Sequence, residues 1–573
     1  MSNWARVELE GNTAGVAGKA AEMLEREISE RCGTNGRANG GAVRILLAIC
    51  PGAGTEGFTI RNGANGSIVI EGHDERGLVY GVGKFLRGCR MRPGEFVPSP
   101  WRGSSRPEKP VRAMYFATHF HNFYHDAPVE KVRRYVEELA LWGCNALSVW
   151  FDMHHYNGIE DPEAQKMIER LRAVLDAGRS VGMGGALTTL ANEGYANSPE
   201  DLRADWTAGH DGYHTPPGGH YHVELCPARP GAIELELKWR REILDAFSGI
   251  PLEYVWLWPY DQGGCTCSRC APWGVNGFLR ISEPVARMIR RIRPEAKIVL
   301  STWYFDRFTG GEWEGLAAKF RNGAPDWVDY LMADDFSKGI PQYVIARGVP
   351  GNLPLLNFPE ISMENMWPWG GFGANPRPDH WQKYWDRAGD LVSGGFPYSE
   401  GIFEDINKVI HLQFGWSPRR RADDIVKEYA EAYFDHEAAA DIQRAVFRLE
   451  REMPVSVGVD SRQTGRDAVR YSVGSRGQAA DTAAILADVE RRLAPDVRRS
   501  WRWRILKIRA DIAAEVERSG GRPTDSTEAW LEELCGIYHA DMAEFAVACP
   551  SVKTLARLHG WEGGNRPENT QCF

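Results

Sequence analysis

The middle of the chain alternates between two hydrophobic periods. Short apolar runs typical of buried strands are followed by stretches with apolar residues three or four positions apart, as in amphipathic helices such as 129–143 and 281–294. The eight strand-like runs are 111–119, 146–152, 184–190, 254–261, 297–306, 327–336, 353–362 and 395–403. Eight parallel strand–helix units close into a barrel. We therefore predict an α/β fold with a (β/α)8 TIM barrel over residues 111–416.

The pattern differs on both sides of this region. Residues 1–105 mix strand-like runs such as "VRILLAI" with helical spacing, which predicts a small N-terminal α/β domain, and the Pro/Ser/Arg-rich stretch 97–110 is typical of a linker. From about residue 418 the strand-like runs stop and helical periodicity continues. This predicts a C-terminal helical domain over 417–573.

Composition and charge narrow the function. With 573 residues and a 43% apolar share, the chain is long enough for several folded domains. Its 68 basic and 77 acidic residues give a net charge of -9 without basic runs, which disfavours nucleic acid and anionic membranes as partners. The chain shows neither a leader-like start nor an apolar run of membrane-spanning length, so we predict a cytoplasmic protein. A homo-oligomer remains open.

Carboxylates gather where the predicted strands end, which is the face that carries the active site in barrel enzymes. We find no P-loop, dinucleotide fingerprint or HExxH motif. A pair of carboxylates can hydrolyse a glycosidic bond without a cofactor, one as acid and one as nucleophile or base. Asp261 follows an aromatic run that would raise its pKa, which favours an acid, although it could instead cap a helix or hold a loop. Glu360 is its predicted partner across the barrel mouth, with Glu400 and Asp335 as the next candidates.

Other strand-end residues are suited to binding a sugar. Indole rings stack on the C–H faces of sugars, and the chain has 21 Trp, although any one of them can simply fill the core. Histidines there can hydrogen-bond hydroxyl groups or bind a metal ion. The candidate substrate-binding residues are His119, His121, Trp150, Asp152, His154, Trp258, Tyr260, Trp303, Tyr304, Asp334 and Trp369.

Three cysteines form a compact CxCxxC motif shortly after Asp261. Cys265, Cys267 and Cys270 supply three thiols, and Cys226 follows the preceding predicted strand as a fourth. Four thiolates can make a closed structural zinc site, while free thiols or a disulfide remain alternatives. Such a zinc ion would be structural because four protein ligands leave no open position for water.

The order of the predicted domains resembles that of several barrel glycoside hydrolases. It is similar to family 67 α-glucuronidases, and its first two domains are similar to family 20 and 84 hexosaminidases, in which the "GHDERGLVYG" pattern at 72–81 recurs. The glucuronidase resemblance implies an acid at Asp261, where that family has Glu, and carboxylates at Asp335 and Glu360. The hexosaminidases have two adjacent acidic residues where this chain has Asp261 and Gln262, which argues against their substrate-assisted mechanism. The CxCxxC motif also resembles a cysteine-bearing loop of family 163 endo-hexosaminidases.

These observations predict an exo-acting glycoside hydrolase for small oligosaccharides or glycosides, most simply glucuronides or N-acetylhexosaminides. A carbohydrate-binding barrel that has lost its chemistry is an alternative. A metal-dependent barrel enzyme that uses His119, His121 and Asp152 is another.

Overall fold

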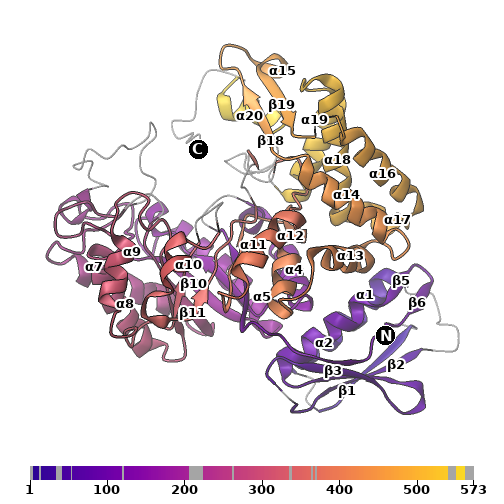
Figure 1. Cartoon of the computed structure of the whole chain (residues 1–573), viewed down its shortest axis with the longest axis horizontal. Helices are drawn as coiled ribbons and strands as arrows, with labels where there is room; N and C mark the ends of the chain where they lie inside the picture. Colours follow the sequence, from indigo (N-terminus) through magenta and orange to yellow (C-terminus); the bar gives the residue numbers. More distant parts are fainter. Residues whose placement is uncertain are drawn as a thin grey trace.

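The architecture comes from a computed structural model of the full chain (Figure 1). The structure describes residues 4–11, 14–33, 42–52, 54–118, 122–205, 223–260, 264–334, 339–362, 366–367, 371–475, 477–539 and 550–561. Within these ranges no helix combines the length and the apolar character that crossing a bilayer requires.

The centre of the molecule is a curled parallel sheet. Its strands are β8 (Val111–Phe116), β9 (Ala146–Trp150), β10 (Gly184–Leu190), β11 (Leu252–Trp258), β12 (Lys297–Ser301), β13 (Tyr330–Met332), β14 (Leu355–Leu356), β16 (Gly394–Gly395) and β17 (Tyr398–Ser399). They are ordered β14-β13-β12-β11-β10-β9-β8-β16, and β17 also pairs with β8. Every pairing is parallel. Each predicted strand region overlaps one of these strands, and the last overlaps both β16 and β17, so the predicted α/β class is confirmed.

The two ends of this sheet are linked beyond the regular strands. Parallel bridges join Asn357 to Gly395 and Glu360 to Tyr398. Between them, Phe396 N–H donates to the Asn357 carbonyl at 3.0 Å and Tyr398 N–H to the Pro359 carbonyl at 2.9 Å. The chain after β14 therefore runs beside β16 and β17, which in turn pair with β8.

Helices surround the sheet in the predicted alternation. They include α4 (Val129–Leu141), α5 (Pro162–Ser180), α7 (Ala232–Ala246), α8 (Gly277–Ile292), α9 (Glu312–Lys319), α10 (Gln342–Arg347), α11 (Pro378–Ala388) and α12 (Asp405–Trp416). Inside the sheet, aromatic side chains such as Tyr115, Trp256 and Phe396 form a separate buried core. A sheet that is buried on both faces explains why its strands are apolar almost throughout.

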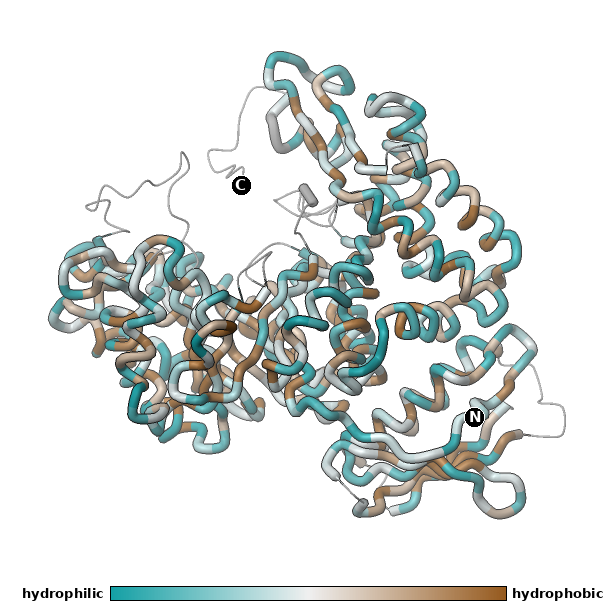
Figure 2. The backbone as a smooth tube through the Cα atoms, in the orientation of Figure 1, coloured by the Kyte–Doolittle hydropathy of each residue, from teal (hydrophilic) through white to brown (hydrophobic). Residues whose placement is uncertain are grey.

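The N-terminal region folds as a second sheet. Strands β1 (Ala5–Leu9), β2 (Val43–Ile49), β3 (Phe58–Asn62), β4 (Ile68–Gly72) and β7 (Gly103–Ser105) are ordered β1-β2-β4-β3-β7. Figure 1 shows α1 (Gly15–Cys32) and α2 (Glu75–Arg87) on one face of it. Figure 2 shows hydrophobic stretches along these strands, consistent with a face covered by helices.

The glycine-rich motif at 72–81 has a packing role. Asp74 caps α2 by accepting a hydrogen bond from the Gly77 N–H. A Cβ atom at Gly77 would lie 2.0 Å from the Gly57 carbonyl oxygen, and one at Gly83 would lie 2.0 Å from the Leu141 carbonyl oxygen. The glycines let α2 approach both the first sheet and α4 closely, so this part of the family resemblance reflects how the first two units pack together.

The C-terminal region is mainly helical, with one exception to the prediction. Its helices include α13 (Ala422–Tyr433), α14 (Ala439–Arg451), α16 (Ala479–Arg492), α17 (Pro495–Arg499), α18 (Trp501–Ser519), α19 (Asp525–Tyr538) and α20 (Val552–His559). The expectation that strands stop after 418 is wrong, because β18 (Val455–Val459) and β19 (Val469–Val473) form an antiparallel pair, and β18 also pairs with β15 (Met366–Trp367). The alternating "VSVGV" and "VRYSV" carried this signal at a period of two.

Half-buried ion pairs join the N-terminal and C-terminal regions. Glu428 of α13 lies 3.0 Å from Lys84 and 3.1 Å from Arg87, both in α2, and 2.7 Å from Arg420. Burial alone would raise the pKa of Glu428, but these three cations outweigh it and lower the pKa. The three regions thus pack as a connected molecule.

Candidate active site

The strand ends that the structure describes bring most of the predicted residues to one side of the curled sheet. Trp150, Asp152, His154, Trp258, Tyr260, Trp303, Tyr304, Asp334, Glu360 and Glu400 all follow or end successive strands in the order β9 to β17. His119, His121, Asp261, Asp335 and Trp369 lie outside the described residues, so their predicted roles stay predictions.

Glu360 and Glu400 are buried neighbours at the ends of adjacent strand segments. The backbone bridge between Glu360 and Tyr398 sets the two segments side by side. Glu360 Oε1 accepts hydrogen bonds from the Ser362 N–H at 2.7 Å and the Ser362 hydroxyl at 2.8 Å. Two donors at one oxygen fix the orientation of this buried carboxyl group. Glu360 is therefore held in a defined position, as a base or nucleophile would be.

Glu400 has a different environment. Its Oε2 accepts from Asn122 Nδ2 at 2.8 Å, and its Oε1 accepts from the Tyr398 hydroxyl. Burial raises the pKa of Glu400 to about 8, and the negative charges of Glu404 and Glu360 add to the rise although the two neutral donors oppose it. The carboxyl group is thus protonated near neutral pH, as a general acid must be.

Residues behind Glu400 fix its backbone. The Tyr538 hydroxyl of α19 donates to the Glu400 carbonyl at 2.8 Å. Glu404 accepts hydrogen bonds from the Ser399 hydroxyl at 2.6 Å and the Gly401 N–H at 2.8 Å. The C-terminal helices therefore take part in holding the end of β17 in place.

A second acidic cluster follows β9 and β10. Glu193 accepts hydrogen bonds from Trp150 Nε1 at 3.2 Å and, at its other oxygen, contacts His154 Nδ1 at 2.7 Å. Asp152 is buried nearby, and its Oδ2 lies 3.2 Å from His155 Nε2. Burial and then the charge of Glu193 raise the pKa of Asp152 well above its usual value. Three predicted binding residues, Trp150, Asp152 and His154, are thus brought together by Glu193.

Aromatic rings form a continuous stack along the next strand ends. The rings of Trp258 and Trp303 are stacked with centroids 5.5 Å apart, and Trp303 stacks on Tyr304 at 4.7 Å. Tyr304 has a φ of 61°, which is uncommon for a residue with a side chain. Trp258 and Trp303 are buried in the core of the sheet, whereas Tyr304, the last ring of the stack, is half-buried. The two buried rings hold Tyr304 rigidly.

Two buried contacts at these strand ends were missed in the sequence. Tyr260 donates its hydroxyl to Glu312 Oε1 at 2.5 Å, and the same oxygen accepts from the Gly274 N–H at 2.6 Å. The Tyr384 hydroxyl of α11 donates to Asp334 Oδ2 at 2.7 Å. Glu312 and Tyr384 lie in helices rather than at strand ends, so strand-end reasoning could not select them. Asn122 and Tyr398, the partners of Glu400, carried no separate signal either.

Among the residues that the structure describes, two groups of side chains have the composition of metal ligands. The thiols of Cys226, Cys265, Cys267 and Cys270 lie within 4.8 Å of one another. The same limit holds for the ligand atoms of Asp152, His154 and His155. The four cysteines of the predicted group therefore lie close together in the structure, although they come from two separate segments of the sequence.

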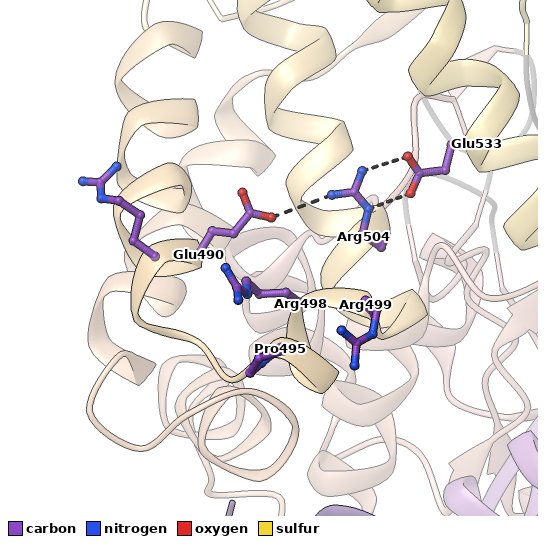
Figure 3. A pocket seen from close by; sticks show the side chains of 7 residues that line it. Glu490, Pro495, Arg498, Arg499, Arg504 and Glu533 are labelled. Atoms are coloured by element: carbon purple, nitrogen blue, oxygen red, sulfur yellow. Dashed lines mark hydrogen bonds and ion pairs between the residues drawn. The ribbon is translucent and has the colours of Figure 1, made fainter. Parts of the chain in front are cut away.

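A large surface pocket lies elsewhere, among the C-terminal helices. It has a volume of about 500 Å³ and is lined by residues including Glu490, Arg498, Arg499, Arg504 and Glu533. Figure 3 shows Arg504 between the two acids, with Glu533 contacted at 2.6 Å and Glu490 at 3.7 Å. The lining has no pair of carboxylates in contrasting environments, so we place the candidate chemistry at the strand ends.

Solved structures with the same fold are glycoside hydrolases. A family 115 4-O-methyl-α-glucuronidase with specificity for decorated arabinogalactans has a TM-score of 0.61 at 10% identity, covering 94% of this chain and 76% of that one. A family 138 enzyme that targets pectin rhamnogalacturonan II has a TM-score of 0.57 at 12% identity, covering 93% and 70%. A family 89 glycoside hydrolase from Clostridium perfringens, in complex with GlcNAc-α-1,4-galactose, has a TM-score of 0.60 at 12% identity, covering 90% and 64%.

The chain shares its overall fold with these three enzymes. The predicted resemblance to this group is thus confirmed at the level of the fold. Neither a protein-family profile nor a curated protein sequence matches the chain. What the chain does must therefore be argued from its own residues.

Proposed function

We propose that this protein is a glycoside hydrolase in which Glu400 is the general acid and Glu360 the nucleophile or base. The observation that carries the proposal is the contrast within one buried pair. Glu360 receives two hydrogen-bond donors at one oxygen, while burial raises the pKa of Glu400 to about 8. One carboxyl group that donates a proton and a second that attacks or acts as the base are the minimal machinery for cleaving a glycosidic bond.

The reaction follows from these two states. Protonated Glu400 donates its proton to the glycosidic oxygen, so that the leaving group departs as a neutral alcohol. Ionised Glu360 attacks the anomeric carbon or takes a proton from the water that attacks it. Tyr398 and Asn122 hold the Glu400 carboxyl group in position while it changes charge. Asp261 and Asp335 remain the alternative acid and carboxylate predicted from the sequence.

We propose small glucuronides or N-acetylhexosaminides as substrates of an exo-acting enzyme. The stack of Trp258, Trp303 and Tyr304 offers a flat apolar surface, and Asp152, His154 and Asp334 supply polar groups for hydroxyls or an acidic or acetamido substituent. A 4-O-methyl-α-glucuronidase and an enzyme bound to a GlcNAc disaccharide among the structural neighbours support these two classes.

We further propose that the curled sheet is a closed (β/α)8 barrel. The bridges Asn357–Gly395 and Glu360–Tyr398, with the pairing of β16 and β17 to β8, support closure between the seventh and eighth strand positions. Closure matters for the function because it brings Glu360 and Glu400 to the same rim as Asp152 and Trp258.

A panel of nitrophenyl glycosides, including α- and β-glucuronides and N-acetylhexosaminides, tests the proposal directly. We expect turnover of at least one member by the wild type and its loss in Glu360→Gln and Glu400→Gln. The exposed Glu163→Gln in α5 is the control and should keep full activity. Activity that survives in Glu400→Gln but is lost in Asp261→Asn would return the acid to Asp261. No turnover combined with measurable sugar binding would favour the carbohydrate-binding alternative.

The leaving group separates the two proposed roles. A dinitrophenolate leaves without a proton, so Glu400→Gln should retain activity on dinitrophenyl glycosides while losing it on unactivated glycosides. Glu360→Gln should be inactive on both, because bond cleavage still needs its carboxylate. Equal losses on both substrates in the two variants would contradict the division of roles.

A second candidate function rests on one observation. The ligand atoms of Asp152, His154 and His155 lie within 4.8 Å of one another, and Glu193 contacts Nδ1 of His154 at 2.7 Å. A carboxylate that orients a metal-binding histidine is a common arrangement. A metal-dependent enzyme would lose activity on treatment with a chelator while its melting temperature stays unchanged, and would regain activity with added metal, whereas the carboxylate mechanism predicts that activity falls with a chelator only where the melting temperature falls too.

A further inference from the structure

Four cysteines from two separate segments meet beside the end of β11. Cys226 precedes α7, and Cys265, Cys267 and Cys270 lie between β11 and α8. The side chains of Cys226, Cys265 and Cys270 are at most 1% exposed, and that of Cys267 is half-buried. Among the described residues these four are the cysteines whose thiols gather in one group, whereas a buried cysteine such as Cys144 can be explained as a small apolar side chain.

The sulfur–sulfur distances exclude a disulfide in this arrangement and fit a tetrahedral metal site. Cys226 Sγ lies 3.8 Å from both Cys267 Sγ and Cys270 Sγ. A disulfide would bring two sulfurs to about 2.05 Å. Four thiolates around Zn²⁺ at about 2.3 Å would lie roughly 3.8 Å from one another, which is the edge of the tetrahedron.

The surroundings supply what a thiolate cluster needs. The backbone N–H of Ala228 faces the Cys226 sulfur, and those of Cys267 and Asp205 face the Cys265 sulfur. The guanidinium of Arg229 also lies close to Cys226. Four thiolates with Zn²⁺ carry a net negative charge, which these donors and this cation would offset.

Local packing builds the motif around one tryptophan. Trp273 Nε1 donates to the Pro259 carbonyl at 2.7 Å. A Cβ atom at Gly264 would lie 2.5 Å from the Trp273 ring, and one at Gly277 would lie 2.2 Å from it. The two glycines therefore let the CxCxxC segment fold closely over the indole, which directs the cysteines toward Cys226.

We propose that Cys226, Cys265, Cys267 and Cys270 bind one structural Zn²⁺ ion. The ion ties the segment before α7 to the segment after β11, and both segments lie at the rim that carries the candidate active site. With four protein ligands it has no open position for a substrate or water, so its role is to hold the rim rather than to take part in catalysis. Loss of a ligand should therefore lower stability, and any loss of activity should follow from the disordered rim.

Metal analysis of the purified full-length protein tests this. We expect one zinc per chain in the wild type, and zinc at background in Cys267→Ser and Cys270→Ser. Cys144→Ser removes a buried thiol in the β8–β9 region and is the matched control, which should keep one zinc per chain. The two ligand variants should also melt at a lower temperature than the control.

A spectroscopic measurement on the wild type covers the case in which the ligand variants do not fold. Exchange of the bound metal for Co²⁺ should produce the thiolate-to-cobalt charge-transfer bands and strong visible bands of a tetrahedral site. The proposal would be overturned if the wild-type protein contained no metal and its four thiols reacted freely or mass spectrometry detected a disulfide. Iron in place of zinc would also overturn it. None of these readouts depends on turnover, so they stand or fall separately from the glycosidase proposal.

Discussion

Glu400 and Asp405 lie five positions apart and are both buried, yet near neutral pH Glu400 is held protonated and Asp405 ionised. Asp405 Oδ2 lies 2.7 Å from Arg502 Nε and accepts from the Tyr429 hydroxyl at 2.6 Å, and its other oxygen accepts from the Tyr135 hydroxyl at 2.8 Å. Burial alone would raise the pKa of Asp405, but the charge and hydrogen bond of Arg502 outweigh it and lower the pKa. Among the described residues, Glu400 has neutral donors, Asn122 and Tyr398, and two nearby acids, Glu404 and Glu360.

The difference shows that buried acidic residues in one network can have either a structural or a catalytic role. At Asp405 the cation Arg502 compensates the negative charge, so the ionised residue joins α12 to α18 and cannot donate a proton. At Glu400 no such cation is among its hydrogen-bond partners, and burial stores a proton at the candidate site. Burial therefore does not distinguish an acidic residue with a structural role from one that takes part in catalysis. The sign of the neighbouring charge distinguishes them.

The largest expected effect is on catalysis at Glu400. Glu400→Gln keeps the size of the side chain and its hydrogen-bonding capacity but removes the proton donor, so kcat on unactivated glycosides should fall by about 10²–10⁴-fold. The melting temperature should change little, since the wild-type group is already neutral near pH 7. Steady-state kinetics and differential scanning fluorimetry measure the two quantities. A large loss of stability with unchanged kcat would reverse the assignment of the two acids.

The next effect concerns the stability of the Asp405 region. Asp405→Asn leaves Arg502 buried with less compensation, and breaking a buried pair costs about 3–5 kcal/mol. Glu138 also lies 2.6 Å from Arg502, which places the expected loss toward the lower end of that range. Urea denaturation measures it, and kcat of the folded protein should stay within a few-fold of wild type. A collapse of kcat in fully folded Asp405→Asn would mean that this residue acts in the chemistry.

The two acids should also contribute to stability with opposite dependence on pH. The pKa of Glu400 is raised in the folded state from about 4.5 to about 8, so its contribution is fully present below pH 4.5 and is lost as the pH rises toward 8. The pKa of Asp405 is lowered, so its contribution is present above its usual value of 3.8 and is lost as the pH falls through the folded-state value. Melting curves of Glu400→Gln should therefore show a smaller loss of stability between pH 5 and 8 than wild type. An identical pH profile in both proteins would contradict the raised pKa.

The smallest effect comes from the neutral donor beside Glu400. Proton donation by Glu400 predicts that kcat/KM of the wild type falls above a pH of about 8. The hydrogen bond from Tyr398 lowers the pKa of Glu400, so Tyr398→Phe should move this basic limb to higher pH and cost about 1–2 kcal/mol in the barrier. A pH–rate profile tests it, with Glu163→Gln as control. A limb that moves to lower pH would show that Tyr398 stabilises the protonated rather than the ionised carboxyl group.

The sequence by itself determined the regular parts of this protein. Apolar runs such as 184–190 match β10, and the alternation of such runs with amphipathic helices predicts the parallel sheet because strands buried on both faces must be apolar. The concentration of polar residues where those runs stop located Glu360, Glu400 and Asp334 at strand ends. The spacing of three cysteines indicated a compact cluster. Each of these signals is local, so the chain displays it without folding.

Only the tertiary structure decided which of these groups carries a proton. Asn122 donates to Glu400 across 278 positions of sequence, and Tyr538, which holds the Glu400 carbonyl, is 138 positions away. Arg502, which sets the charge of Asp405, is 97 positions from it. A pKa depends on burial and on charges within a few ångströms, and those neighbours come together only when the sheet curls and the C-terminal helices pack against it.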